Sequence, residues 1–96
     1  MSASDEGVFA ISVAARMASM EIQNLRVYER RGLVDPARTP GGTRLYSEGD
    51  VARLVRIGEL LAQGLNLAGI ARVIELETEV ERLRTENARL GMDESS

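Results

Sequence analysis

Polar side chains on a predicted short helix are the residues of this sequence best suited to chemistry. Gln23, Asn24, Arg26 and Arg31 share the polar side of a helix expected over residues 21–31. Amide and guanidinium groups can hydrogen-bond the edges of bases or bind phosphate oxygens. Because a polar helix face is more often simply solvated, this helix alone is only a weak indication of nucleic-acid binding.

A second cationic element follows this helix and strengthens the interpretation. Pro40, Gly41 and Gly42 predict a turn, in which glycine tolerates positive φ, between extended arms over 37–39 and 43–46. The polar side chains of the arms are Arg38, Thr43, Arg44 and Tyr46. A small wing beside a helix is a DNA-binding arrangement, so we expect these residues and Gly42 to contact DNA.

Catalytic and metal-binding chemistry finds little support in the chain. The sequence has no cysteine and no histidine, which excludes disulfides, thiolate or imidazole ligands, and catalysis by either residue. The acidic cluster comprises Glu75, Glu77, Glu79 and Glu81. A surface helix would leave these carboxylates solvated rather than paired in a pocket. We therefore expect no enzyme, no cofactor and no metal site.

The charge is distributed unevenly. The formal net charge is −3, yet residues 12–58 carry eight arginines against five acidic residues. Residues 72–94 carry four arginines against seven acidic residues. Arginine can bind phosphate or guanine through two parallel hydrogen bonds, although a GC-rich genome would also favour arginine. The positive field thus belongs to the first half of the chain.

Local signals define the elements that position these residues. Ser12 is expected to cap a helix over 13–18, and Gly32 to end the helix over 21–31. Two short helices with a tight link have the dimensions of a helix-turn-helix. The expected fold is therefore mainly α, a winged helix-turn-helix with a small two-stranded β wing.

Two longer helices are expected after the wing. Ser47 and Asp50 predict a capping box at the start of a helix, and Gly64 is expected to end this helix. The apolar stripe expected on that helix is Val51, Leu54, Val55, Gly58 and Leu61. Asn66 is then expected to cap a last helix over about 67–90, which is too long for so small a domain to cover.

The last helix carries a heptad pattern. Val73, Val80 and Asn87 fall at a positions, and Leu76, Leu83 and Leu90 at d positions. These side chains could fold back on the chain's own core, but they exceed what one small core needs. A partner helix is the simpler cover, so we expect a homodimer in which Asn87 favours one register. The pattern leaves open whether the two helices run parallel or antiparallel.

The expected organisation is a flexible N-terminus over 1–10 and a DNA-binding domain over 11–65. A dimerising coiled-coil helix over 66–90 and a flexible tail over 91–96 complete it. No apolar run approaches the roughly 18 residues of a membrane span, and the N-terminus does not resemble a signal peptide. We therefore expect a cytoplasmic protein without membrane contact.

Taken in order, these motifs resemble the MerR family of transcription regulators. The matching segments are Ile11-Ser-Val-Ala-Ala15, Leu25-Arg-Val-Tyr-Glu29, Gly32-Leu-Val34, Arg38-Thr39, Gly41-Gly42, Arg44-Leu-Tyr-Ser47 and Asp50. The segment Gly64-Leu-Asn-Leu-Ala-Gly-Ile-Ala-Arg-Val-Ile-Glu-Leu-Glu77 is similar to the heat-shock repressor (HspR-like) branch of actinobacteria. Together the resemblances cover roughly residues 11–77.

The resemblance implies roles for individual residues. Arg26 and Tyr28 would contact phosphates, and Gln23 and Asn24 would face the major groove. The wing contacts would come from Arg38, Thr43 and Arg44. Family members bend and often untwist the operator, so part of the specificity would be indirect.

The sequence departs from the branch at one point and stops short of many relatives. Glu21-Ile22 stands where many members of the branch have His-Pro, so this acid is expected either to change the sequence preference or to face away from DNA. Many relatives also carry a C-terminal ligand or metal domain, whereas this sequence predicts no small-molecule effector domain. The branch is associated with the chaperone DnaK as a co-repressor, which leaves a chaperone partner open here.

The leading hypothesis is a homodimeric repressor, or promoter-distorting regulator, that binds an inverted-repeat operator in double-stranded DNA. The branch points to heat-shock or chaperone genes as targets. An architectural or excisionase-like DNA-binding protein is one alternative. An interaction module whose coiled coil binds another protein is the other.

Overall fold

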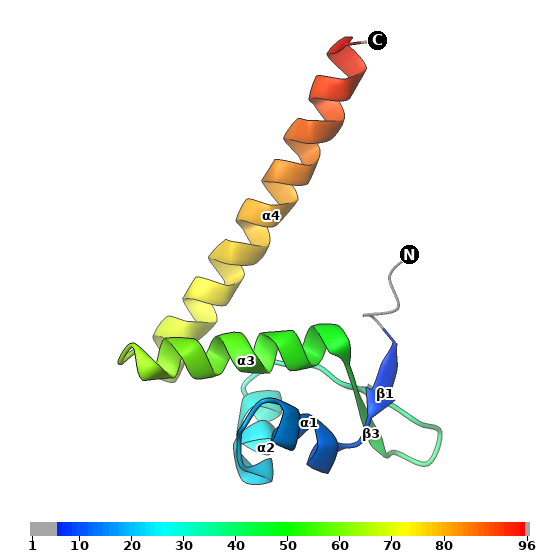
Figure 1. Cartoon of the computed structure of the whole chain (residues 1–96), viewed down its shortest axis with the longest axis vertical. Coiled ribbons are helices and arrows are strands. Elements are labelled where there is room, and N and C mark those ends of the chain that lie inside the picture. The colour runs from blue at the N-terminus through cyan, green and yellow to red at the C-terminus, as the bar shows by residue number, and fades with distance from the viewer. Residues whose placement is uncertain (1–5, 96) are drawn as a thin grey trace. The chain divides into compact units, whose positions relative to one another are not determined.

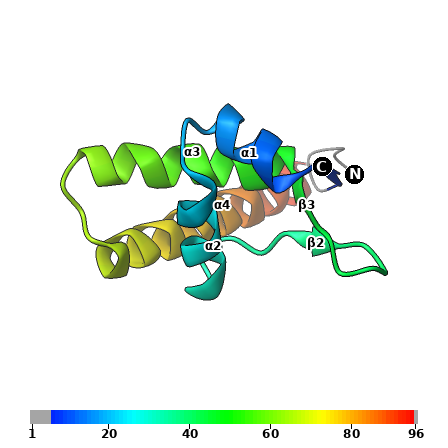
Figure 2. The same cartoon turned by 90° about the horizontal axis from the view of Figure 1, so that it is seen from below.

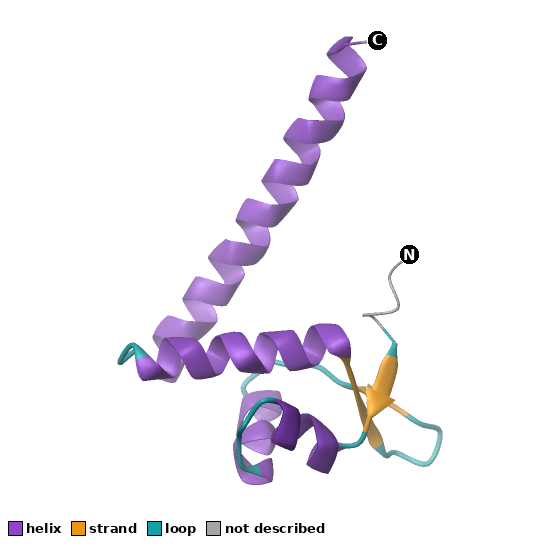
Figure 3. Ribbon diagram, in the orientation of Figure 1, coloured by secondary structure: helices purple, strands orange, loops and turns teal. Residues whose placement is uncertain are grey.

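The computed structural model describes residues 6–95, with side chains described from 6 to 91. The elements follow the order β1-α1-α2-β2-β3-α3-α4 (Figure 1). The chain divides into two compact units, Met1–Gly64 and Leu65–Ser96. Helix is the main component and the strands are short, as Figure 3 shows by colour. The predicted fold class, mainly α with a small wing, is confirmed.

The first two helices form the predicted pair with a tight link. Helix α1 spans Ile11–Met17 and α2 spans Ile22–Arg30. Ser12 does not cap α1: the cap is Ala10, whose side chain makes no capping hydrogen bond, because α1 starts directly after a strand. The link turns at Ser19, which has a φ of 56°.

Helix α2 ends as its sequence predicts. Gly32 has a φ of +75°, a conformation that glycine adopts without the steric cost of a Cβ. The N–H of Gly32 donates to the carbonyl of Glu29 over 3.0 Å, and the N–H of Leu33 donates to that of Tyr28 over 2.9 Å. These two bonds form a Schellman motif, which satisfies carbonyl groups at the helix end.

The sheet has one strand more than the wing requires. Strands β2 (Ala37–Arg38) and β3 (Arg44–Ser47) form the predicted hairpin, whose loop projects away from the helices of the first unit (Figure 2). Strand β1 (Gly7–Phe9) pairs antiparallel with the other edge of β3, giving the order β1-β3-β2. Residues 7–9 therefore form a strand, where the sequence predicted flexibility over 1–10. Residues 1–5 of that prediction lie outside the described residues.

Gly7 is required by this pairing. A Cβ at Gly7 would lie 2.7 Å from the carbonyl oxygen of Leu45. Such an approach is far closer than van der Waals contact allows. Glycine thus lets β1 come close to the neighbouring strand β3.

Helix α3 spans Glu48–Ala62 and begins with the predicted capping box. Ser47 Oγ accepts from the N–H of Asp50 and Asp50 Oδ2 accepts from the N–H of Ser47, both over 2.9 Å. The predicted stripe was only partly right. The buried side chains of the helix are Val51, Leu54, Ile57 and Leu60. Val55 and Leu61 are instead 41% and 38% exposed, because the buried face follows a spacing of three residues.

The second unit is helix α4, Leu67–Ser95. Its start is capped as predicted, since the N–H of Gly69 donates to Asn66 Oδ1 over 2.8 Å. The helix continues past Leu90 to Ser95, where the sequence predicted a flexible tail over 91–96. Ser96 lies outside the described residues. None of the helices in the described chain combines the length and apolar character that crossing a membrane requires.

Candidate nucleic-acid interface

One face of α2 packs into the first unit and the opposite face carries polar side chains. Leu25 and Tyr28 are buried, at 0% and 5% exposure. Gln23, Arg26 and Arg30 are exposed, and their spacing of three and four residues places them on one face. The outer face of α2 is therefore polar and cationic, as the sequence predicted.

Three arginines on and just after α2 carry charge that the protein does not neutralise. Arg26, Arg30 and Arg31 are exposed, and within the described residues none of them has an ion-pair partner. An exposed guanidinium offers five N–H donors in a planar fork. Such groups suit the phosphate oxygens of a nucleic acid.

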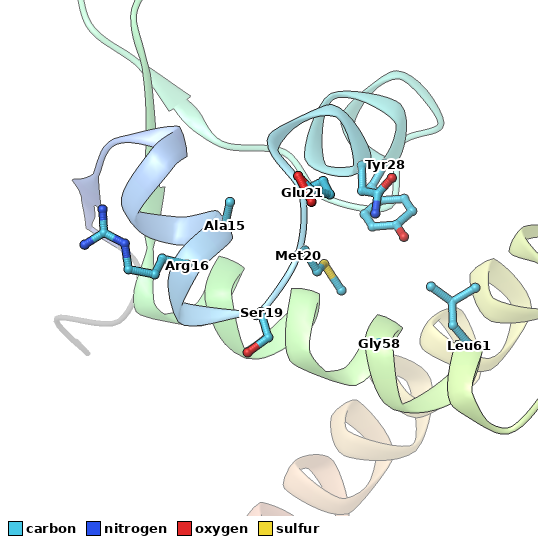
Figure 4. Close-up of a pocket in the computed structure, with 9 residues that line it drawn as sticks. Ala15, Arg16, Ser19, Met20, Glu21, Tyr28, Gly58 and Leu61 are labelled. Carbon is cyan, nitrogen blue, oxygen red and sulfur yellow. The ribbon is translucent and has the colours of Figure 1, made fainter.

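Asn24 lies away from Gln23, on the flank of α2. It lines a hollow of the first unit together with Tyr28, four residues later, and Glu21, which precedes the helix. Figure 4 shows Glu21, Ser19 and Tyr28 around this hollow. The structure therefore separates the two polar residues that the sequence had placed together: Gln23 lies on the outer face and Asn24 at its edge.

The wing turn is held by its own backbone. The N–H of Thr39 donates to the carbonyl of Thr43, and the N–H of Gly42 donates to that of Thr39, both over 2.8 Å. The N–H of Thr43 donates to Thr39 Oγ1 over 3.1 Å. Gly42 has a φ of +88°, so its role in the wing is conformational. Thr43 is exposed at the tip, where a ligand can reach it.

Glu29 links α2 to both arms of the wing. Arg38 donates from Nη2 to Glu29 Oε2 over 2.8 Å, and Arg44 donates from Nε to Glu29 Oε1. The Glu29 side chain is 15% exposed, whereas those of Arg38 and Arg44 are 50% and 36% exposed. Both predicted wing arginines are therefore paired and still reachable from solvent.

Sequence reasoning missed Glu29 as a functional residue. The available signal was that it is the one acid within the basic run from Arg26 to Arg31. A lone carboxylate among arginines is a natural partner for cations brought in from elsewhere in the fold. That these would be Arg38 and Arg44 depends on tertiary structure, which the local pattern did not contain.

Tyr46, which was predicted to contact DNA from the wing, is buried in the single chain. Its side chain is 0% exposed, and within the described residues its hydroxyl has no hydrogen-bond partner. Tyr46 lies on β3, the middle strand of the sheet, which also contacts α1 and α3. Burial raises the pKa of Tyr46, and the carboxylate of Glu29 raises this pKa further. In this structure Tyr46 belongs to the core.

Tyr28, which was predicted to contact phosphate, is also mostly buried. It is 5% exposed, and burial raises the pKa of its hydroxyl. It lines the wall of the hollow, where Figure 4 shows its side chain. A phosphate contact would therefore have to occur at the hollow and not on the outer face of α2.

The second unit presents a long apolar strip. Leu76, Val80, Leu83 and Leu90 are 44–46% exposed, and Val73 is half-buried. Asn87 is exposed in the same heptad pattern. A shallow groove along α4 is lined by Val73, Leu76, Glu77, Val80, Glu81 and Arg84. The heptad residues thus form an apolar surface with charged borders, which suits another helix.

Acidic residues of α4 form ion pairs with arginines on the surface of the same helix. Exposed pairs three residues apart join Arg82 to Glu79 and Arg72 to Glu75. The Arg82 side chain, by hydrogen bond and charge, lowers the pKa of Glu79. The described residues contain no group of three or more acidic side chains placed to hold a metal ion. The exposure of these carboxylates and their pairing along the helix agree with a structural role on the surface of α4.

Comparisons with known proteins agree with this geometry. Residues 9–77 match the model of the MerR HTH family of regulatory proteins. The chain is 46% identical over 87 residues to a Streptomyces coelicolor protein described as heat shock protein HspR, covering 90% of this chain and 58% of that protein. It is 37% identical over 90 residues to the HTH-type transcriptional regulator GlnR of Bacillus anthracis, covering 91% and 70%.

A solved structure matches as well. A MerR-family transcriptional regulator from Bacillus cereus superposes with a TM-score of 0.66 at 26% identity, covering 91% of this chain and 75% of that one. The sequence thus spans a little over half the length of HspR and more of GlnR and the Bacillus cereus regulator.

Proposed function

The chain belongs to the MerR HTH family of DNA-binding transcription regulators, and from this premise we propose that it acts as a homodimer on an inverted-repeat operator. Each protomer would place α2 in the major groove and the wing against the neighbouring backbone. The observation that carries this proposal is the junction at Glu29. It brings the arginines of the wing to the helix that bears Gln23 and Arg26.

The residues on and beside the exposed outer face of α2 would have different roles in DNA binding. Gln23 is the best candidate for reading a base edge, since an amide can make two hydrogen bonds to adenine. Arg26 and Arg31, which have no ion-pair partner within the described chain, would bind phosphates. Asn24 would reach DNA only from the edge of this face. Tyr28 would contribute at most through the hollow.

The wing would add contacts from Arg38, Thr43 and Arg44. All three are at least partly exposed, and the positive φ of Gly42 shapes the tip that presents Thr43. Wing residues that bind the backbone fix the orientation of a protein on the duplex without reading sequence directly. Specificity beyond Gln23 would then depend on DNA shape and deformability.

A second copy of the chain would cover the apolar strip of α4. The strip repeats at heptad spacing, and its large side chains are nearly half exposed in the single chain. Soluble proteins rarely expose so continuous an apolar surface without a partner. Asn87 at an a position would favour one register over others. Two-fold symmetry of the dimer would then match the symmetry of the operator.

The similarity to HspR supports a proposal about targets. We propose promoters of heat-shock or chaperone genes, with the protein acting there as a repressor or by distorting the promoter. A chaperone co-repressor is a partner to be tested on the same grounds. Such a protein would work in the cytoplasm, where its DNA is.

Capture of genomic fragments by the purified protein, followed by sequencing, tests these proposals together. Recovery of an inverted repeat with half-sites about 10 bp apart, or a multiple of this, supports the dimeric regulator. Its presence upstream of chaperone genes supports the proposed targets, and its absence there overturns them. Uniform recovery of DNA would favour an architectural protein, and no recovery at all would favour a protein-interaction module.

A further inference from the structure

Glu29 is the least expected charge in the interface, because it places an anion among groups suited to bind an anion. Its two carboxylate oxygens have different partners: Oε2 accepts from Arg38 and Oε1 accepts from Arg44. The two arginines stand opposite each other on the paired strands β2 and β3. A single carboxylate therefore bridges three elements: the helix α2 and both arms of the wing.

This arrangement fixes the wing in position. A two-stranded hairpin is only marginally stable alone, and β2 contains just two residues. Ion pairs to a side chain that is 15% exposed are screened less by salt than pairs in open solvent. Glu29 thus provides a fixed point on α2 against which both arms of the wing are aligned.

The same arrangement lowers the positive charge of the wing. Two guanidinium groups and one carboxylate leave a net charge of +1 at the junction, instead of the +2 that the arginines alone would carry. Affinity for DNA irrespective of sequence rises with each cation that can neutralise a phosphate. Glu29 therefore reduces the sequence-independent attraction at the place where the wing would meet DNA.

We propose that Glu29 is a positioning residue that raises the specificity of DNA binding. It aligns the wing with the outer face of α2, which carries Gln23 and Arg26. Its negative charge also neutralises one positive charge that would otherwise bind phosphates irrespective of sequence. The proposal rests on the proposed function, since it concerns how the same interface separates its operator from other DNA. A carboxylate that did nothing but stabilise the fold would leave the ratio of specific to non-specific affinity unchanged.

The test compares the wild-type chain with E29Q, which keeps the shape of the side chain and removes its charge. Binding to random duplex DNA is measured by fluorescence anisotropy over a series of salt concentrations. The slope of log affinity against log salt should become steeper by about 0.9, the value for one additional phosphate contact. Affinity for random DNA should rise roughly three- to tenfold near 0.1 M salt.

Two further variants separate charge placement from charge alone. E75Q removes one carboxylate from an exposed pair on α4 and should leave the salt slope unchanged. The double variant E29Q/R38Q removes one of the freed cations, so its slope should return to that of the wild type. A slope for E29Q equal to that of the wild type, or a steeper slope for E75Q as well, would overturn the role of Glu29 in charge.

The positioning role is measured without DNA. Backbone amides of residues 37–47 should exchange hydrogen faster in E29Q than in the wild type, while those of α3 should be unchanged. Equal exchange in the wing would contradict the alignment.

On the operator recovered by capture, the ratio of specific to non-specific affinity should fall about tenfold in E29Q. A parallel loss of both affinities would indicate a structural role only. A wild type without any preferred site would count against the proposed function and would leave the slope test on random DNA intact.

Discussion

Arg38 donates from Nη2 to Glu29 Oε2 over 2.8 Å, and this bond joins the wing to the helix that would read DNA. The two residues are nine positions apart and belong to different elements.

Replacing Arg26 by alanine should weaken binding to all DNA sequences. Arg26 is exposed on the outer face of α2 and has no ion pair within the described chain, so its loss removes a phosphate contact with little effect on the core. Affinity should fall about three- to tenfold at low salt, and the salt slope should decrease by about 0.9. Anisotropy titrations check this, with R72A on α4 as a control that also removes one arginine. An unchanged slope would mean that Arg26 does not bind a phosphate.

Replacing Gln23 by alanine should act on specificity. An amide that makes two hydrogen bonds to a base contributes about 1–3 kcal/mol of discrimination at one position. The Q23A variant should therefore tolerate any base at one position of each half-site and bind random DNA as the wild type does. Selection from a randomised operator library measures this. A loss of affinity that is equal at every position would contradict base reading by Gln23.

Replacing Leu83 by glutamate should separate the protomers without unfolding the first unit. Leu83 is 46% exposed in the single chain, so the substitution places a charge on the surface that the partner helix is expected to cover. Sedimentation should show a monomer, and operator binding should lose its dependence on two half-sites. T85E adds the same charge at an outer heptad position and should remain dimeric. A dimer in L83E would place the interface elsewhere.

Replacing Tyr46 by phenylalanine should leave stability unchanged or raise it. The hydroxyl is buried without a partner in the described chain, and removing an unsatisfied buried group can increase the free energy of unfolding by about 1 kcal/mol. Denaturant unfolding measures this effect, and Y46A, which should lose about 3–5 kcal/mol, controls for the packing of the ring. DNA affinity should be that of the wild type. A large loss of affinity in Y46F would return Tyr46 to the interface.

Tyr46 also predicts how stability depends on alkaline pH. Burial raises the pKa of Tyr46 above that of the unfolded chain, so the folded state holds the proton more tightly. Its contribution to stability is complete below about pH 10, the ordinary tyrosine pKa, and is lost as pH rises through the folded value. Unfolding curves from pH 8 upward should therefore show a smaller alkaline loss for Y46F than for the wild type. Some loss should remain, because burial also raises the pKa of Tyr28.

The features that the sequence predicted well are controlled by neighbouring residues. The box between Ser47 and Asp50, the end of α2 at Gly32 and the cap at Asn66 each depend on contacts within three or four positions. The side chains and glycine conformations involved have strong local preferences. The polar face of α2 and the wing turn could be predicted for the same reason.

The features that were missed depend on contacts distant in sequence. Strand β1 has three residues and no alternating pattern, and it forms because Gly7 and Phe9 pair with Ser47 and Tyr46. Tyr46 is buried on β3, which packs against the distant helix α1, and the local pattern of the wing does not indicate this contact. The partners of Glu29 could not be predicted for the same reason, because no residue near Glu29 in sequence indicates that it pairs with Arg38 and Arg44. The buried face of α3 was misread for a geometric reason. Ile57 and Gly58 both lie about one helical turn after Leu54, and the local pattern does not show that Ile57 is the buried one.

Ser47 is both the last residue of β3 and the cap of α3, so the strand passes into the helix without a loop between them. In mechanical terms the wing and α3 are joined without a flexible segment. The two hydrogen bonds between Ser47 and Asp50 stiffen the junction between the strand and the helix. Glu29 forms a second strut between the wing and α2. A force on the wing would therefore pass directly into α3, since no loop lies between them to act as a hinge.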